Sequence, residues 1–421
     1  MPARLPVRPD LDQLKHQAKD LLRAIHAGDP GARATFREHH PGVEPAAAKL
    51  ADAQLVLART YQASSWTRLV QAARLATAIW EDDFDAVLQL VTANPHLIDE
   101  PVLIRSDSNW GRPMTYAANL GRDRIIRMLR ERGATDLEPA AGRAALQGHV
   151  ETARMLYEMA GRPPLPDDAL GGPAYTLSAA GTAFLLAMGA QVINKDRQRL
   201  APVSVVLETD GRKPAEKHAI LEMYVRHGLE LPDTPVMALH RGRIDLLEAH
   251  LSQDPGLLGR TFTHRQIYPT EMGCRVPLDA TVGTPLAGTT LLHMCVDYGE
   301  LDIARWLLDR GMDVNAPAAV GRSGFGGYTA LFNTVVSQPN FWMNYGKRGP
   351  FVAPFTELLL ERGADPNVRA SIWKRLHPGH GDPARHDYRD VTALSWGRRF
   401  HAPIFVSEPS MRLIAAAGGV E

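Results

Sequence analysis

Short amphipathic segments separated by glycine turns dominate this chain. The clearest example lies at residues 288–316, where an apolar pattern over 290–297 ends at Gly299 and a second pattern runs over 301–309. The second pattern places leucine and alanine on one face of a helix. Gly311 follows it, where a helix C-cap needs a left-handed backbone. One such helix pair cannot bury its apolar face alone, so the pattern predicts neighbours of the same kind.

The neighbours are present from about residue 78 onward. A leucine-rich helix end followed by a turn glycine recurs at 128–136, 184–192, 223–231, 306–314 and 358–366. Variants with an Asx/Pro turn occur at 90–99 and 250–259, and degenerate members at 155–162 and 413–419. A repeated helix pair with these turns indicates a solenoid of about nine units.

Residues 1–76 lack the repeated pattern. Their apolar spacing predicts helices at 11–25, 46–61 and 64–79, with Asp10 or Asp12 as the first N-cap. The expected task of this segment is to cover the exposed apolar face of the first repeat, because terminal repeats need a polar outer face. The predicted division is therefore a helical cap at 1–76 and an array at 77–421.

The best repeat carries a family resemblance. It has Thr290-Leu291-Leu292-His293, then Gly299, Leu307-Leu308 and Gly311-Met312-Asp313-Val314-Asn315. In this it resembles the ankyrin repeat, with leucine where the family has a proline, and the resemblance covers roughly 78–421. It implies an all-α, ankyrin-type helix-turn-helix solenoid with extended finger loops, and a structural role for His293 as the turn histidine that hydrogen-bonds a neighbouring repeat. Residues 1–76, through QLKHQAKDLLRA and SSWTRL, resemble the N-terminal helical extension of some bacterial ankyrin proteins.

The spacing of the turn glycines shows where the array is elaborated. Gly133, Gly161 and Gly189 are 28 residues apart, against about 33 for the family. Later intervals reach 52 to 55 residues, so insertions of roughly 20 residues interrupt the C-terminal repeats. The first, second and fourth of them should extend finger loops, and the third should separate the two helices of one repeat. They occupy 260–285, 316–326, 337–354 and 369–390.

Aromatic and basic side chains in these insertions suit recognition, because rings and guanidinium groups dominate interface hot spots. The first hypothesis is therefore a non-enzymatic scaffold that recognises a protein partner through the concave finger and loop face of the C-terminal repeats. The alternative for the rings is that they only pack down to order long loops. The candidate contacts are Arg265, Tyr268, Arg275, Trp342, Tyr345, Trp373 and Lys374.

The second hypothesis is an enzyme or small-molecule-binding protein with a pocket built where the insertions at 260–285, 337–354 and 369–390 converge. Its candidate residues are His264, Glu271, Asp279, His380 and Arg399. No nucleotide-binding glycine motif or catalytic signature is present, so no catalytic residue is assigned. That absence favours the scaffold and leaves enzymatic activity open.

Two further chemistries have weaker support in the sequence. His377, His380, Asp382 and His386 would offer metal ligands, but their glycine and proline spacing does not place them on one helix face. Cys274 near His264 and Glu271 would offer a thiol–imidazole pair, with nothing to establish their proximity. Neither a metal nor another cofactor is expected, and Cys295 is expected to be a buried apolar residue of its repeat.

Composition narrows the class of protein and the kinds of partner to be expected. Of 421 residues, 45% are hydrophobic and 22% charged, as in folded proteins. Lys plus Arg equals Asp plus Glu, at 47 each, which argues against a nucleic-acid partner. Two cysteines make no disulfide framework, and no run of 18 apolar residues predicts a membrane span. Without a secretory h-region at the N-terminus, we expect a cytoplasmic protein.

Overall fold

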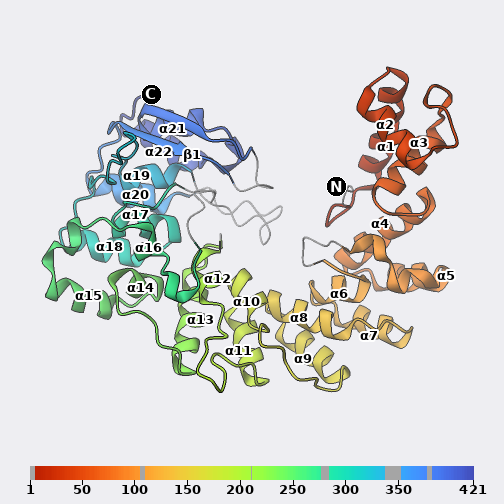
Figure 1. Ribbon diagram of the computed structural model, residues 1–421, viewed down its shortest axis with the longest axis horizontal. Coiled ribbons are helices and arrows are strands. Elements are labelled where there is room, and N and C mark those ends of the chain that lie inside the picture. The colour runs from red at the N-terminus through yellow and green to blue at the C-terminus, as the bar shows by residue number, and fades with distance from the viewer. Residues whose placement is uncertain (1–4, 105–109, 210, 276–283, 337–351, 377–381) are drawn as a thin grey trace. The chain divides into compact units, whose positions relative to one another are not determined.

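The computed structural model describes residues 5–104, 110–209, 211–275, 284–336, 352–376 and 382–421. The chain divides into two compact units, Met1–Leu165 and Pro166–Glu421. Helices make up nearly all the regular structure, and they follow one another as antiparallel pairs (Figure 1). The predicted all-α helix-turn-helix solenoid is confirmed.

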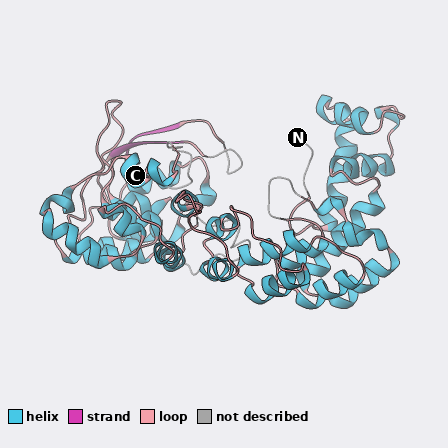
Figure 2. Cartoon of the chain, turned by 60° about the horizontal axis from the view of Figure 1, so that its bottom comes forward, coloured by secondary structure: helices cyan, strands magenta, loops and turns pink. Residues whose placement is uncertain are grey.

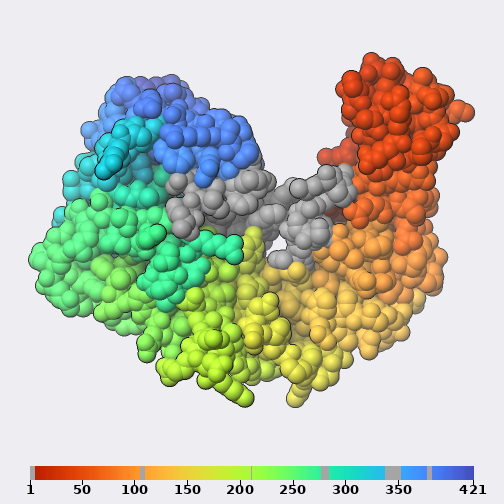
Figure 3. All heavy atoms as spheres, in the orientation of Figure 1, coloured from red at the N-terminus to blue at the C-terminus, as the bar shows by residue number. Residues whose placement is uncertain are grey.

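The first unit begins with a small helical bundle. Asp10 accepts hydrogen bonds from the backbone N–H groups of Asp12 and Gln13 and so caps the first helix, as predicted. Ile25, Phe36 and other buried residues form the centre of this bundle, and Figure 3 shows its red atoms lying directly on the orange atoms that follow. The bundle contains α1 (Leu11–His26), α2 (Pro30–His39), η1 (Pro45–Ala47) and α3 (Leu50–Thr60). Of these, α2 is not among the predicted helices.

Three helix pairs complete the first unit. Their first helices stack on one another, since α4 contacts α6 and α6 contacts α8. The predicted boundary between residues 76 and 77 lies inside α4. The division of the chain into a helical cap and a repeat array therefore remains a prediction. The pairs are α4 (Trp66–Glu81) with α5 (Phe84–Ala93), α6 (Pro113–Ala118) with α7 (Asp123–Glu131), and α8 (Leu137–Gln147) with α9 (Val150–Met159); η2 (Pro95–Asp99) and η3 (Pro101–Leu103) follow α5.

Six more helix pairs make up the repeats in the described part of the second unit. One apolar core runs through its later repeats, from Val236 to Ile414, because first helices pack on first helices and second on second. The pairs are α10 (Gly171–Thr176) with α11 (Ala179–Ala187), α12 (Val203–Glu208) with α13 (Pro214–Arg226), α14 (Pro235–His240) with α15 (Ile244–Gln253), α17 (Leu291–Tyr298) with α18 (Leu301–Asp309), α19 (Ala330–Val335) with α20 (Pro354–Glu361), and α21 (Ala393–Arg399) with α22 (Glu408–Ala416).

The insertions fall where the glycine spacing predicts. The third separates α19 from α20, and the others precede the first helix of a repeat. Short helical turns occupy the described part of the first, α16 (His264–Ile267) and η5 (Thr270–Met272), and η4 (Pro255–Gly259) lies just before it. The fourth contains an antiparallel hairpin of β1 (Ala370–Lys374) and β2 (His386–Val391), magenta in Figure 2, which the sequence pattern does not predict. η6 (Pro403–Phe405) links α21 to α22.

The predicted turn glycines adopt the required backbone. Gly311, after α18, has φ of 88°, and Gly133, after α7, has φ of 103°. Each glycine follows the end of a helix and has a left-handed backbone conformation, which residues with a side chain rarely adopt. The periodic signal in the sequence therefore corresponds to a real constraint on the chain.

Candidate partner-binding surface

Backbone hydrogen bonds join successive fingers of the second unit. The N–H of Phe262 donates to the carbonyl oxygen of Thr289 over 2.8 Å, and the N–H of Ala319 to that of Gly288 over 2.8 Å. The N–H of Gly326 continues the series to Ser371 of β1, over 2.7 Å. We call residues 260–263, 286–290, 316–329, 370–376 and 382–391 the finger ladder. Strand-like pairing of this kind fixes the loops relative to one another, so the surface they form is preorganised.

Two arginines cover two aromatic rings on this ladder. The Cζ atom of Arg385 lies 4.7 Å from the ring centre of Trp373 and 5.0 Å from that of Phe325. The Cζ atom of Arg389 lies 4.3 Å from the Phe325 ring. Such stacking orients a guanidinium group while its N–H edge stays open to solvent. We call Phe325, Trp373, Arg385 and Arg389 the arginine–aromatic cluster.

The cluster carries excess positive charge. Asp387 accepts from Nε of Arg385 over 2.7 Å and lies 3.9 Å from Nη2 of Arg389. The two arginine side chains are 48% and 60% exposed, and ion pairs this exposed are worth less than about 1 kcal/mol. One carboxylate therefore serves two guanidinium groups weakly, which leaves both able to pair with carboxylates from outside.

The structure separates the predicted contact residues. Arg265 on α16 and Arg275 have exposed side chains, and Trp373 is half-buried within the cluster. Tyr268 turns inward: its hydroxyl accepts a hydrogen bond from the Tyr298 hydroxyl over 2.5 Å, and burial raises the pKa of Tyr268. Trp342 and Tyr345 lie outside the described residues.

Lys374 is not a surface residue. Its side chain is fully buried, because β1 alternates and places Ala370, Ile372 and Lys374 on its inner face. A partner that docks on the outside of the hairpin cannot contact it, so the prediction of Lys374 as a contact residue is wrong.

Sequence reasoning misses Phe325, Arg385 and Arg389. A usable signal exists, since Arg385, Asp387 and Arg389 alternate along the chain and a strand puts alternate residues on one face. Interpreting the segment as a polar loop around its histidines hides this period of two.

Two of the five residues predicted to form a pocket are exposed. Glu271 and Arg399 have exposed side chains and lie on separate elements, η5 and the end of α21. His264 is partly buried, with its ring 4.8 Å from that of Tyr268. Asp279 and His380 lie outside the described residues. The exposure of the two charged groups counts against a closed catalytic pocket formed by this set.

His293 has the structural role that the resemblance implies. Its Nε2 lies 3.0 Å from the carbonyl oxygen of Tyr328 in the next repeat, and its Nδ1 lies 2.9 Å from the Thr290 hydroxyl. A carbonyl only accepts, so the proton sits on Nε2. Burial lowers the pKa of His293 to about 4. The neutral ring therefore joins two repeats next to the finger ladder.

This burial predicts a pH dependence of stability. The pKa of His293 is about 4 in the folded chain and about 6.5 when unfolded, so the unfolded state binds more protons between these values. The neutral His293 ring contributes roughly 3 kcal/mol to the free energy of unfolding. This contribution is fully present above pH 6.5 and is lost as pH falls from 6.5 through 4. Urea unfolding of the wild type and of His293→Gln across this range should show a flatter profile for the variant. Parallel profiles would contradict the assignment.

A buried ionic network connects repeats that are not neighbours. Lys217 Nζ on α13 lies 3.1 Å from Glu300 Oε1, and His218 Nε2 lies 2.9 Å from the same oxygen. Close by, Arg212 Nη2 lies 2.9 Å from Asp297 Oδ2. The side chains of Lys217 and Glu300 are 5% and 3% exposed, and burial lowers the pKa of Lys217 although Glu300 opposes the shift. The α14–α15 pair lies between these elements in the chain, so the network spans a whole repeat.

Neither cysteine is set up as a nucleophile. Cys274 is buried, and that burial, followed by the nearby Glu208 carboxylate, raises the pKa of its thiol to about 12. Cys295 is fully buried within α17, as predicted. A thiol needs its thiolate form to attack, so these environments oppose the reaction.

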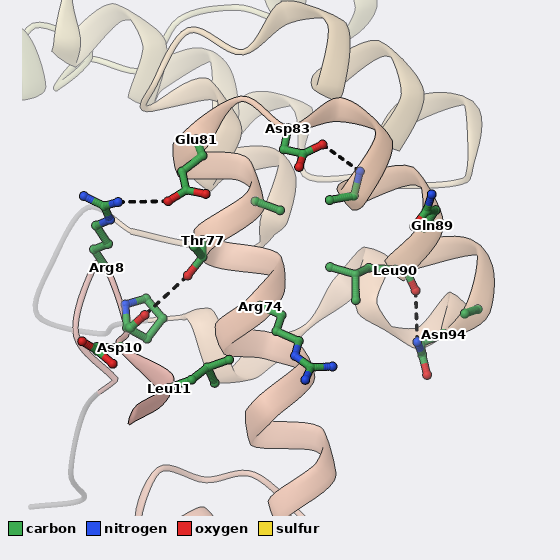
Figure 4. Close-up of a pocket in the computed structure, with 14 residues that line it drawn as sticks. Arg8, Asp10, Leu11, Arg74, Thr77, Glu81, Asp83, Gln89, Leu90 and Asn94 are labelled. Carbon is green, nitrogen blue, oxygen red and sulfur yellow. Dashed lines mark hydrogen bonds and ion pairs between the residues drawn. The ribbon is translucent and has the colours of Figure 1, made fainter. Parts of the chain in front are cut away.

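A groove in the first unit is not predicted by the sequence. It has a volume of about 920 Å³ and lies between the N-terminal segment, α4 and α5 (Figure 4). Arg8 pairs with Glu81 across 3.0 Å, and both side chains are about half exposed. Asp10 and Asp83 serve as the N-caps of α1 and α5. Arg8, Glu81 and the two capping carboxylates thus have structural roles, and Arg74 and Gln89 complete the polar part of the wall.

One family model matches the repeat described above. Residues 287–319 match the family model of the ankyrin repeat, and together with the helix pairs this identifies an ankyrin-type fold. The human ASB11 ankyrin repeat domain is similar at 14% identity, with 73% of this chain and 99% of that chain covered and a TM-score of 0.26. The ankyrin repeat domain of Bcl-3 is similar at 15% identity, with 81% and 97% covered and a TM-score of 0.20. No curated protein matches. The fold assignment rests on this chain's own geometry and the family match.

The described residues contain no group of three or more His, Cys, Asp or Glu side chains arranged to hold a metal ion. His377 and His380 of the metal alternative lie outside them. None of the helices in the described ranges is long and apolar enough to cross a membrane.

Proposed function

We propose that this chain is a non-enzymatic scaffold that binds a protein partner on the finger ladder of its second unit. Ankyrin arrays present extended concave surfaces to their ligands. In this chain, insertions lengthen the fingers of the C-terminal repeats, and backbone hydrogen bonds join these fingers to one another. The observation that carries the proposal is the arginine–aromatic cluster, where exposed guanidinium groups are held on rings.

The cluster also indicates the chemistry of the partner. Planar guanidinium groups bind carboxylates in a bidentate manner, and Asp387 compensates only one of the two positive charges. We therefore expect the partner to present acidic side chains near an apolar residue that covers Trp373. Arg265 and Arg275, both exposed, are further candidate contacts outside the ladder.

The test is loss of partner affinity in the double variant Arg385→Ala and Arg389→Ala. Partners are first identified by affinity purification and mass spectrometry, then measured as purified pairs by calorimetry. Arginine hot spots are worth about 2 kcal/mol or more, so affinity should fall at least tenfold. Arg305→Ala is the matched control, because Arg305 is 52% exposed on α18, outside the ladder.

Two outcomes would overturn the proposal. One is an unchanged affinity in the double variant with the fold intact by circular dichroism. The other is an equal loss in Arg305→Ala, which would show a general charge effect and not a defined surface.

A further inference from the structure

The second unit contains a cavity of its own, apart from the arginine–aromatic cluster. It lies where α17 and α19 end and α20 and α22 begin. Its volume is about 230 Å³. The wall combines apolar side chains such as Val296 and Phe355 with the polar groups of Asn333, Ser407 and Ser410. All of these belong to the second unit.

Asn333 is the unusual residue in this wall. It is 4% exposed, and within the described structure neither its Nδ2 nor its Oδ1 has a hydrogen-bond partner. Buried amides are almost always paired, and an unpaired one is costly. The repeat does not require it: the equivalent residues, four after the threonine that opens the first helix, are the buried apolar Met294 and Trp396. Asn333 thus presents a free donor and a free acceptor to the cavity.

The other polar groups add hydrogen-bond donors. Thr356 donates its hydroxyl to Ser410 over 2.9 Å, and the hydroxyls of Ser407 and Ser410 share one bond of 2.9 Å. That shared bond uses one of the two serine hydrogens, so the other remains available. The N-terminus of α20 also opens here, with Ala353 as an N-cap that offers no side-chain hydrogen bond.

The charges in the wall cancel. Arg212 and Asp297 both line the cavity and pair with each other over 2.9 Å. A fully charged ligand would lose its hydration without gaining an unpaired counter-charge, which is unfavourable. A neutral ligand that offers both an acceptor and a donor matches Asn333.

We propose that this cavity binds a small, neutral, planar molecule through an amide-type edge, an N–H beside a C=O. The edge would form two hydrogen bonds with the Asn333 side chain. Its carbonyl would face the serine hydroxyl or the start of α20. Carboxamides, lactams and pyrimidine bases all carry this edge and fit the volume.

The experiment uses the full chain with nicotinamide and uracil as probes and benzoate as the charged comparison. Saturation-transfer NMR should show contact with one or both neutral probes and not with benzoate. The side-chain amide resonances of Asn333 should shift on binding, a readout that needs no variant. If neither neutral probe contacts the protein at millimolar concentration, or if benzoate binds equally well, the proposal fails.

Asn333→Leu separates a ligand site from a structural residue. Removing an unpaired buried amide should raise Tm while abolishing probe binding, whereas Met294→Leu, at the equivalent position of the preceding repeat, should leave binding unchanged. A fall in Tm in Asn333→Leu would assign Asn333 to the fold. Retained probe binding in that variant would place the ligand elsewhere.

Discussion

Replacing Glu300 by alanine is expected to destabilise the second unit by about 3–5 kcal/mol, the usual result of removing one partner from a buried ion pair. The carboxylate lies within 3.1 Å of both Lys217 and His218 and is 3% exposed. Without it, the Lys217 ammonium stays buried without its counter-charge or must give up its proton. Either outcome weakens the contact between α13 and the α17–α18 turn.

Chemical denaturation followed by tryptophan fluorescence measures this loss. Asp302→Ala is the matched control, because Asp302 is 90% exposed in the first turn of the same helix, and it should cost less than about 1 kcal/mol. Lys217→Met combined with Glu300→Leu should restore most of the stability, since a buried pair replaced by apolar residues is often neutral. Equal losses for Glu300→Ala and Asp302→Ala would show that the network contributes nothing specific.

Replacing Trp396 by alanine is expected to cost about 3–5 kcal/mol as well, through the cavity left in the core. Trp396 is fully buried on α21. Its ring centre lies 6.0 Å from that of Phe332 in the previous repeat and 6.4 Å from that of Tyr388 in β2. The indole thus supports both the last helix pairs and the hairpin that carries Arg385 and Arg389.

The comparison with Trp373→Ala makes this prediction specific. Trp373 is half-buried under Arg385 on the outer side of the hairpin, so its loss should reduce partner affinity while changing stability by less than about 1 kcal/mol. Trp396→Ala should lower Tm strongly and weaken partner binding indirectly. Equal losses of stability in the two variants would contradict the assignment of Trp373 to the binding surface and of Trp396 to the core.

Local signals explain why the helix pairs are predictable. A turn such as that after α18 depends on residues within one helix length, and Gly311 is the residue that its left-handed backbone requires. The role of His293 is equally predictable, because its contacts repeat a pattern local to Thr290 and the next turn.

Non-local pairing explains what the sequence does not reveal. Lys374 faces inward only because β1 pairs with β2, and its opposite residue His386 is twelve positions away; composition alone favours exposure for lysine. Lys217 and Glu300 are 83 residues apart, and nothing near either one indicates an ion pair. Asn333 occupies an ordinary repeat position, where only the packed structure reveals its unpaired amide.

The ionic network changes how this array should unfold. Repeat proteins are commonly treated as one-dimensional chains whose stability is a sum of repeat terms and nearest-neighbour interfaces. The contact from Lys217 on α13 to Glu300 at the start of α18 passes over the α14–α15 pair, which adds a term between second neighbours. When the array unfolds from either end, the contact between Lys217 and Glu300 must break before the helix pairs that it joins can separate. The middle of the second unit should therefore exchange its amide hydrogens as one cooperative block, spanning three helix pairs that a nearest-neighbour description would let open one by one.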